Sequence, residues 1–101
     1  MLVVHAVFPI DPDQRETALD HARTLAEESR SEDGVIDYCV AIDVDDENLF
    51  RFVEQYDDEA AFEAHADSEH FARFADLLPE LLAGEPEVTR FEVDSATAVE
   101  L

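Results

Sequence analysis

Four segments of the chain have the residue pattern of β-strands: the first is apolar on both sides, and the others show the two-residue period of a strand with one apolar side. The predicted strands are Leu2–Phe8, Val35–Val44, Leu49–Tyr56 and about Glu87–Asp94. The first has no charged residue on either side, so we expect it to be covered on both faces. The second carries Ile36, Tyr38, Val40, Ile42 and Val44 on one apolar side. The third carries Phe50, Phe52, Glu54 and Tyr56 on one side. The last is expected to bury Thr89, Phe91 and Val93.

Between these strands, apolar residues recur at helical spacing. The predicted helices are Pro12 to about Ser31, about Asp58–Ala66, and a third helix capped by Asp67 or Ser68. Asp11 is the expected N-cap of the first helix, with Pro12 at its first position and Gln14 placed for a capping box. Pro79 is expected to interrupt the third helix and to leave one further turn over Glu80–Ala83.

Each predicted helix has one side that suits packing against a sheet. The first presents mostly alanine, at Ala18, Ala22, Leu25 and Ala26, which allows a close approach. The second groups Ala61, Phe62 and His65. The third carries the stripe Phe71, Phe74, Ala75 and Leu78.

The order strand, helix, strand, strand, helix pair, strand is that of the ferredoxin-like split βαβ fold, an α+β class. We therefore predict one domain over residues 1–101, with a four-stranded antiparallel sheet and helices on one face. Helices on one face leave the other face of the sheet bare, and a monomer rarely exposes so large an apolar patch. The prediction that follows is a homodimer packed sheet to sheet.

The charge of the chain restricts its partners. Twenty-seven Asp and Glu oppose six Arg, with no Lys, for a net charge of −21. Nucleic acids and anionic membranes are therefore not expected as partners, because both are bound largely through Lys and Arg. Such charge density favours a cytosol that contains molar salt, as in a halophile, although an ordinary acidic protein is the alternative. One cysteine, no signal peptide and no long apolar run favour a soluble cytoplasmic protein.

Few residues suggest chemistry by spacing alone. His65 and His70 are five positions apart with no HExxH motif, and the two glycines make no phosphate loop, so neither a metal site nor a nucleotide cofactor is expected. Cys39, in mid-strand, is expected to be a small buried hydrophobe rather than a nucleophile.

His65 is the most informative candidate, because it shares a helix side with Ala61 and Phe62. It is either a core histidine with satisfied ring nitrogens, or a base kept neutral in an apolar pocket. Glu54 lies on an aromatic strand side, so it either pairs with Arg or His or has a raised pKa. Tyr38 offers a phenol on an aliphatic side. His70 lies in the first turn of a predicted helix, where the helix dipole disfavours its charged form. The alternative is that His70 is simply exposed to solvent. His5 is expected at the dimer interface, and His21 at the surface.

One stretch of the chain resembles a known family. The run from Phe52 to Phe71 has a strand with Glu-x-aromatic, a helix ending in Ala-His65, and His70 opening the next helix. It is similar to the signature of the antibiotic-biosynthesis monooxygenase (ABM) superfamily, and Gly34 with Tyr38 matches the family's Gly-x-x-x-Tyr. The quinol monooxygenase branch looks most similar. There Glu-Gln-Trp stands at the positions of Glu54, Gln55 and Tyr56, so this chain has Tyr56 in place of Trp.

The resemblance implies a dimer with a pocket between sheet and helices in each subunit, and oxygenation of a quinol or similar aromatic by O2 without metal or flavin. His65 would be the base, Glu54 would orient it, and Tyr38 would hold a substrate oxygen. The implied pocket residues are Phe50, Phe52, Tyr56, Phe62, His70, Phe71 and Phe74. Haem degradation is not expected, because that branch has a Trp where His65 stands. The alternative is a non-catalytic dimer that binds small molecules or responds to stress, with His65 and Glu54 as a satisfied core pair.

Overall fold

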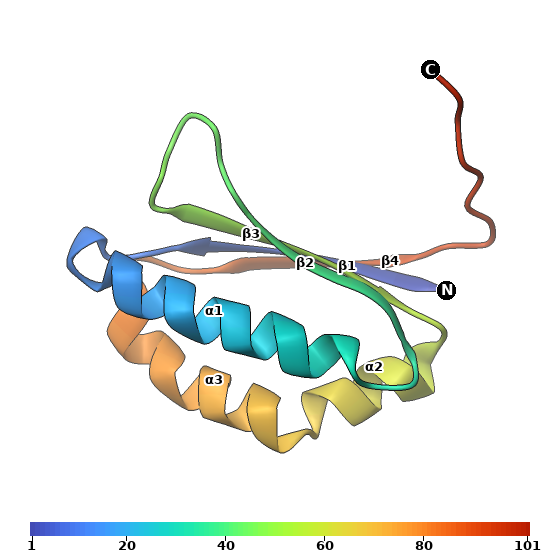
Figure 1. Cartoon of the computed structure of the whole chain (residues 1–101), viewed down its shortest axis with the longest axis horizontal. Coiled ribbons are helices and arrows are strands. Elements are labelled where there is room, and N and C mark those ends of the chain that lie inside the picture. The colour runs from blue at the N-terminus through green and yellow to red at the C-terminus, as the bar shows by residue number, and fades with distance from the viewer.

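The computed structural model describes all residues 1–101, and it has the predicted ferredoxin-like arrangement. Its elements are β1 (Leu2–Pro9), η1 (Pro12–Gln14), α1 (Arg15–Arg30), β2 (Val35–Ile42), β3 (Leu49–Tyr56), α2 (Glu59–Ala66), α3 (Glu69–Leu81) and β4 (Glu87–Glu92). The strands form one antiparallel sheet in the order β2-β3-β1-β4. All three α-helices lie on the same side of this sheet (Figure 1). No helix is long and apolar enough to cross a membrane.

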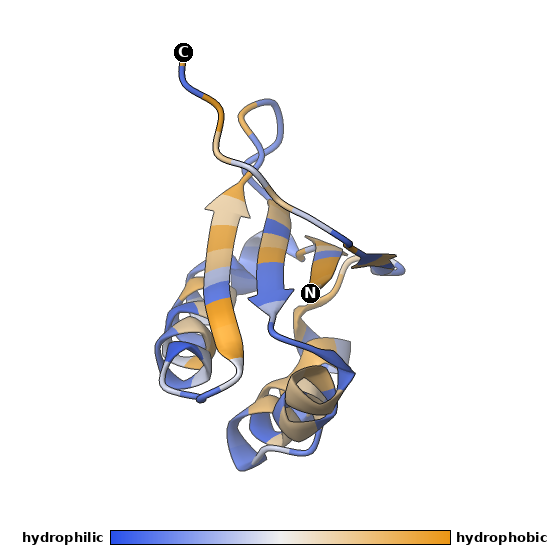
Figure 2. Ribbon diagram, turned by 90° about the vertical axis from the view of Figure 1, so that its right-hand side faces the viewer, coloured by the Kyte–Doolittle hydropathy of each residue, from blue (hydrophilic) through white to orange (hydrophobic).

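The core lies between the sheet and the helices. In the register of these strands Leu2 faces Tyr56 and Phe8 faces Phe50, so their alternate residues share the helix-facing side. The buried apolar residues of β1 and β3 are Leu2, Val4, Ala6, Phe8, Phe50, Phe52 and Tyr56. The predicted alanine-rich side of α1 is buried against them, and Phe74 and Leu81 of α3 complete the layer. Along the strands and helices, apolar residues form bands separated by polar ones (Figure 2).

The start of the first helix differs in detail from the prediction. Asp11 does cap it, because its side chain accepts a hydrogen bond from the Asp13 N–H. One 3₁₀ turn follows, and the α-helix begins only at Arg15. The capping box is wrong, since Gln14 makes no side-chain cap hydrogen bond. The Asp11 N–H that a capping box would satisfy instead donates to the Leu81 carbonyl at 2.8 Å.

The second strand is shorter than predicted and contains a bulge. It ends at Ile42, where the Asp43 side chain accepts from the Asp45 N–H and starts a turn, so Val44 is 97 % exposed. Val35 pairs with Tyr56 and Asp37 pairs with Gln55, so two steps along β2 match one step along β3 and the register shifts there. The extra residue, Ile36, is half exposed, while Tyr38 is buried. The prediction that Ile36, Tyr38, Val40, Ile42 and Val44 share one apolar side of the strand is therefore wrong for Ile36 and Val44.

Pro79 does not interrupt the third helix, which continues to Leu81. A proline removes one backbone donor, and here the loss falls in the last turn of the helix. The helix still closes at its C-cap, because the Leu82 N–H donates to the Leu78 carbonyl at 3.0 Å. Of the predicted further turn at Glu80–Ala83, Glu80 and Leu81 belong to α3, and Leu82 and Ala83 lie beyond it.

The last strand is exposed, contrary to the prediction that it buries Thr89 and Phe91, and Val93, also predicted to be buried in it, lies beyond its end and is half-buried. All six of its residues are exposed, and it ends at Glu92. Thr89 pairs with His5 and Phe91 pairs with Val3, which places both on the side of the sheet away from the helices. Alternation predicts which residues share a side but not which side faces the helices, and β4 is an edge strand.

The outer face of the sheet is not covered within one chain. It carries Val3, His5 and Val7 of β1, with Cys39, Val53 and Phe91 from the other strands. The expectation that β1 is covered on both faces is therefore wrong for the single chain. Cys39 is exposed there rather than buried. His5 packs edge-on against Phe91, with ring centroids 5.1 Å apart.

Candidate functional site

A mostly apolar cavity of about 120 Å³ lies between the sheet and the α2–α3 end of the helical layer. Its lining consists of Val4, Ala6, Phe8, Tyr38, Glu54, Phe62, His65, Ala66, Phe71 and Val88. The polar groups at its wall come from Tyr38 of β2, Glu54 of β3 and His65 of α2. These are the three side chains that the sequence nominates for catalysis, and the fold brings them to one cavity. Ala66 and Val88 are exposed residues of its wall.

The position of His65, in the last turn of α2, is fixed by the N-caps of α2 and α3. The Asp58 side chain accepts from the Ala61 N–H and starts α2. Ser68 starts α3 by accepting from the Phe71 N–H, and its hydroxyl also donates to the His65 carbonyl at 2.6 Å. The imidazole is 2 % exposed and packs among aromatic rings, including Tyr38 at 5.2 Å and Phe71 at 5.2 Å between centroids. Position and orientation of the ring are therefore fixed.

The partner of His65 is Glu32, which sequence reasoning missed. Glu32 lies in the turn after α1, and its Oε2 is 2.8 Å from Nδ1 of His65. A carboxylate can only accept, so Nδ1 carries the proton and the neutral ring has its lone pair on Nε2. Nε2 is buried and has no hydrogen-bond partner. The chain thus holds a neutral imidazole of defined tautomer with one unpaired nitrogen beside an apolar cavity.

Burial also sets the protonation of His65. Desolvation lowers the pKa of His65, because the imidazolium is disfavoured away from water, and the Glu32 carboxylate only partly opposes this. The neutral form therefore dominates near pH 7. It is the form that can accept a proton.

Glu54 belongs to a separate hydrogen-bonded group and not to His65. The Tyr56 hydroxyl donates to Glu54 Oε1 at 2.5 Å. Burial raises the pKa of Glu54 to about 7, although hydrogen bonds from Tyr56 and Tyr38 lower it. Burial also raises the pKa of Tyr38 and of Tyr56, and the nearby Glu54 adds to both shifts. Both phenols therefore stay protonated, and Glu54 titrates near neutral pH. The contact that orients His65 is expected from Glu54, but Glu32 makes it instead.

The other residues nominated for the pocket divide into two groups. Phe62 and Phe71 line the cavity. Phe50, Phe52, Tyr56, His70 and Phe74 do not. Phe52 is packed in the core, where its ring lies 4.9 Å from Phe8 and 5.7 Å from Phe74. Tyr56 is fully buried behind the cavity wall and meets Phe62 edge-on.

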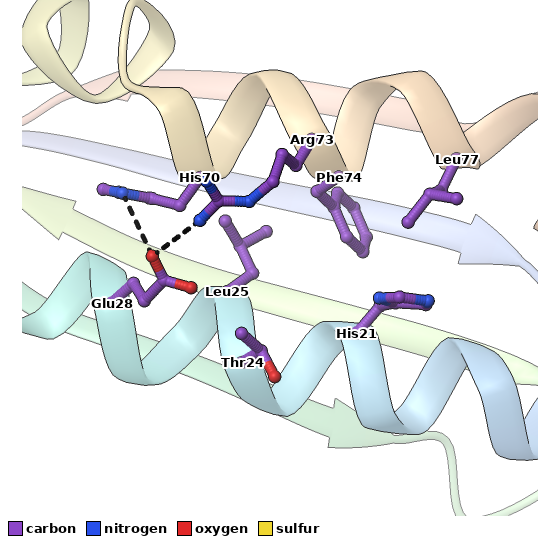
Figure 3. A pocket seen from close by; sticks show the side chains of 8 residues that line it. All are labelled: His21, Thr24, Leu25, Glu28, His70, Arg73, Phe74 and Leu77. Carbon is purple, nitrogen blue, oxygen red and sulfur yellow. Dashed lines mark hydrogen bonds and ion pairs between the residues drawn. The ribbon is translucent and has the colours of Figure 1, made fainter.

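His70 does not line the cavity, but it contacts the same carboxylate as His65. Its Nε2 is 2.8 Å from the same Glu32 oxygen that contacts His65. It also lines a second, more polar pocket of about 160 Å³ between α1 and α3, where Glu28 bonds to Arg73 at 3.0 Å (Figure 3). His21, expected at the surface, is half-buried and lines the same pocket. Glu32 therefore joins two histidines that sequence spacing treats as unrelated.

Comparison with known proteins agrees with this architecture. Residues 1–77 match the family described as "Antibiotic biosynthesis monooxygenase". The chain is 36 % identical over 93 residues to "Putative monooxygenase YcnE" of Bacillus subtilis, covering 92 % of this chain and 98 % of that one.

Solved structures give the same result. PA3566 from Pseudomonas aeruginosa superposes with a TM-score of 0.85 at 31 % identity, covering 93 % of this chain and 94 % of that one. Rv0793 from Mycobacterium tuberculosis has a TM-score of 0.88 at 26 % identity, covering 95 % and 98 %. The family resemblance inferred from the run Phe52–Phe71 is thereby confirmed. The chain belongs to the antibiotic biosynthesis monooxygenase family.

Proposed function

We propose that this chain is a monooxygenase that uses O2 on a small electron-rich aromatic, a quinol or similar compound, with His65 as the base. The observation that carries the proposal is the buried, unpartnered Nε2 of His65 in the wall of a mostly apolar cavity. Buried polar atoms are nearly always paired, so an orphan beside a cavity suits a ligand with a hydrogen to donate. Membership of a monooxygenase family supports the reaction class.

The reaction needs little from the protein besides a base, a dry cavity and orientation. Nε2 of His65 accepts the hydroxyl proton of the quinol. The resulting anion passes one electron to O2, and the two radicals combine to form a carbon–oxygen bond at the ring. The imidazolium returns its proton to the distal peroxide oxygen. Loss of the ring C–H proton then breaks the O–O bond and releases water. One O2 and one quinol thus give one hydroxyquinone and one water.

Two neighbouring side chains suit the substrate oxygens. Tyr38 stays protonated in the cavity wall, so its hydroxyl is a hydrogen-bond donor. Because burial raises the pKa of Glu54 to about 7, its carboxyl group can donate to or accept from a second oxygen. Glu32 is a positioning residue, because it acts through the Nδ1 of His65. The cavity of about 120 Å³ suits one or two fused rings better than a larger polycycle.

The test is oxygenation of 1,4-naphthohydroquinone in molar KCl, followed as O2 uptake and as hydroxynaphthoquinone formed. We expect His65→Ala to lower kcat by about 10²-fold or more, as expected for a lost general base. His21→Ala, in the second pocket, is the matched control and should keep wild-type turnover. Uptake unchanged by His65→Ala removes this base from the mechanism. Binding of the quinol by wild type without turnover favours the non-catalytic binding function.

We further propose that the working form is a homodimer packed through the outer face of the sheet, in a salt-rich cytoplasm. The support is the uncovered face with Val3, Val53 and Phe91, the last 43 % exposed. The excess of 27 acidic residues over 6 Arg supports a salt-rich cytoplasm, because molar salt shortens the range of electrostatic repulsion to about 3 Å. Val53→Asp is expected to leave a monomer by size-exclusion chromatography. A dimer that survives this substitution rejects the proposed interface.

A further inference from the structure

Three side chains from three elements converge at the junction of the helices. Glu32 follows α1, His65 ends α2, and His70 lies in the first turn of α3. Glu32 Oε2 is 2.8 Å from His65 Nδ1 and 2.8 Å from His70 Nε2, and the three atoms lie within 4.8 Å of one another. The side chains of Glu32 and His70 are only 17 % and 16 % exposed. The convergence is therefore built into the fold.

Two imidazole nitrogens and one carboxylate oxygen are a ligand set that suits first-row divalent transition metals. Ca²⁺ and Mg²⁺ are bound mainly by oxygen ligands, so they fit this set poorly. With bonds of about 2.0–2.2 Å, two ligand atoms lie about 2.9 Å apart at a right angle and about 3.4 Å apart at the tetrahedral angle. To bind one ion, the two 2.8 Å contacts to Glu32 lengthen slightly, and the two imidazole nitrogens, which lie within 4.8 Å of each other, move closer together. We propose that Glu32, His65 and His70 bind one divalent transition-metal ion, with further coordination positions left to water.

The surroundings also suit an ion at this place. The other ring nitrogen of His70, Nδ1, lies 3.8 Å from Glu28 Oε2, in the direction where a metal-bound histidine usually has a carboxylate. Arg73 is the nearby cation, and it pairs with Glu28 and with none of the three ligands. Ser68 joins α2 to α3 through its bonds to the His65 carbonyl and the Phe71 N–H, which fixes the spacing of the two histidines.

Metal binding and the proposed base compete for one imidazole. A metal on Nδ1 takes the lone pair there, so the proton of neutral His65 must move to Nε2. Nε2 then becomes a donor and cannot accept a proton from a quinol. The ion is therefore an inhibitor of the oxygenation, and this one consequence rests on the proposed function. The binding site itself does not.

The test is titration of the full-length protein with Zn²⁺ by calorimetry, in molar KCl with excess Mg²⁺ to occupy surface carboxylates. We expect one Zn²⁺ per chain, with affinity reduced by more than about tenfold in His70→Ala and in Glu32→Gln. His21→Ala, half-buried beside His70, is the matched control and should bind as wild type. The proposal is overturned if wild type binds no Zn²⁺, or if His70→Ala and Glu32→Gln bind it as tightly as wild type.

A second readout keeps the test independent of folding and of turnover. Co²⁺ bound by these ligands has a visible absorption spectrum that Zn²⁺ displaces, and circular dichroism checks that each variant is folded. If His70→Ala does not fold, His70→Gln replaces it. Because no substrate is present, the absence of oxygenation leaves this result unaffected. Zn²⁺ binding without oxygenation, or oxygenation without Zn²⁺ binding, therefore identifies which proposal fails.

Discussion

Nδ1 of His65 lies 2.8 Å from Oε2 of Glu32, although the two residues are 33 positions apart in the chain. This contact fixes which ring nitrogen carries the proton. It leaves Nε2 of a buried imidazole unpaired at the cavity wall. The interpretation of the site depends on this pair more than on any other contact.

The negative charge of Glu32 should have a measurable effect on the pKa of His65. Glutamine at position 32 can still accept the Nδ1 proton, but it removes the negative charge that partly offsets the burial of His65. We therefore expect Glu32→Gln to lower the pKa of His65 further, as followed by ¹⁵N NMR in the presence of a chelator. Glu27→Gln, an exposed acid on α1, is the control for loss of one charge. A His65 pKa that is unchanged or raised in Glu32→Gln contradicts the pairing.

Glu54 should make stability depend on pH in a defined window. The folded state raises the pKa of Glu54 from 4.5 to about 7, so between these values the folded chain holds a proton that the unfolded chain has lost. Its contribution to stability is complete below about pH 4.5 and is lost as the pH rises to about 7. By the conversion of 1.36 kcal/mol per pH unit, the loss is about 3 kcal/mol.

Glu54→Gln keeps an acceptor for Tyr56 and removes this titration. The variant should therefore gain stability relative to wild type as the pH rises from 4.5 to 7, measured as the free energy of unfolding in urea. Glu63→Gln, exposed on α2, is the matched control. Parallel pH profiles for Glu54→Gln and wild type show that Glu54 is not the group responsible.

Gly34 positions α2 against the sheet by having no side chain. A Cβ at Gly34 would clash with Cβ of Ala61, which lies one turn before His65 on α2. We expect Gly34→Ala to cost about 1–3 kcal/mol of unfolding free energy, the usual range for overpacking. Ala61→Gly removes the clashing atom and should recover part of the loss in the double variant.

The matched substitution is Gly84→Ala, where the added Cβ would meet Pro9 at an ordinary 3.6 Å. Chemical denaturation of the four variants measures the effect. If Gly34→Ala and Gly84→Ala cost the same, the close approach of Gly34 to Ala61 does not constrain the fold.

The proposed dimer should depend on salt more than most dimers do. Two chains of charge −21 repel each other, and the Debye length falls from about 30 Å at 0.01 M to about 3 Å at 1 M salt. We expect light scattering to report twice the 11.4 kDa of one chain in molar KCl, and a shift toward one chain at low salt. A species of 11.4 kDa in molar KCl rejects the dimer.

The sequence predicts the parts of this fold that depend on local patterns. The strands β1 and β3, the alanine side of α1 and the caps at Asp11 and Ser68 are all found. The errors arise where a pattern does not determine the answer. A bulge at Ile36 changes which residues of β2 share a side, and the outward side of Phe91 depends on an edge strand that the helices do not cover.

The candidate site shows the same limit. Tyr38, Glu54 and His65 can be nominated because each is a polar residue in an apolar pattern. Glu32 cannot be nominated from the sequence, because it is one of 27 acidic residues and lies in a polar turn with no distinguishing pattern. Its importance comes from a contact across 33 residues, and local sequence carries no signal for it.

The most direct test of the central proposal is the fate of ¹⁸O₂ supplied with 1,4-naphthohydroquinone to the wild-type chain and to His65→Gln in molar KCl. Spontaneous oxidation yields unlabelled naphthoquinone and hydrogen peroxide, whereas the proposed reaction places one ¹⁸O atom in hydroxynaphthoquinone and the other in water. We predict labelled hydroxynaphthoquinone from wild type and its loss in His65→Gln. Equal labelling by both proteins, or only unlabelled naphthoquinone from wild type, would contradict a monooxygenase with His65 as its base.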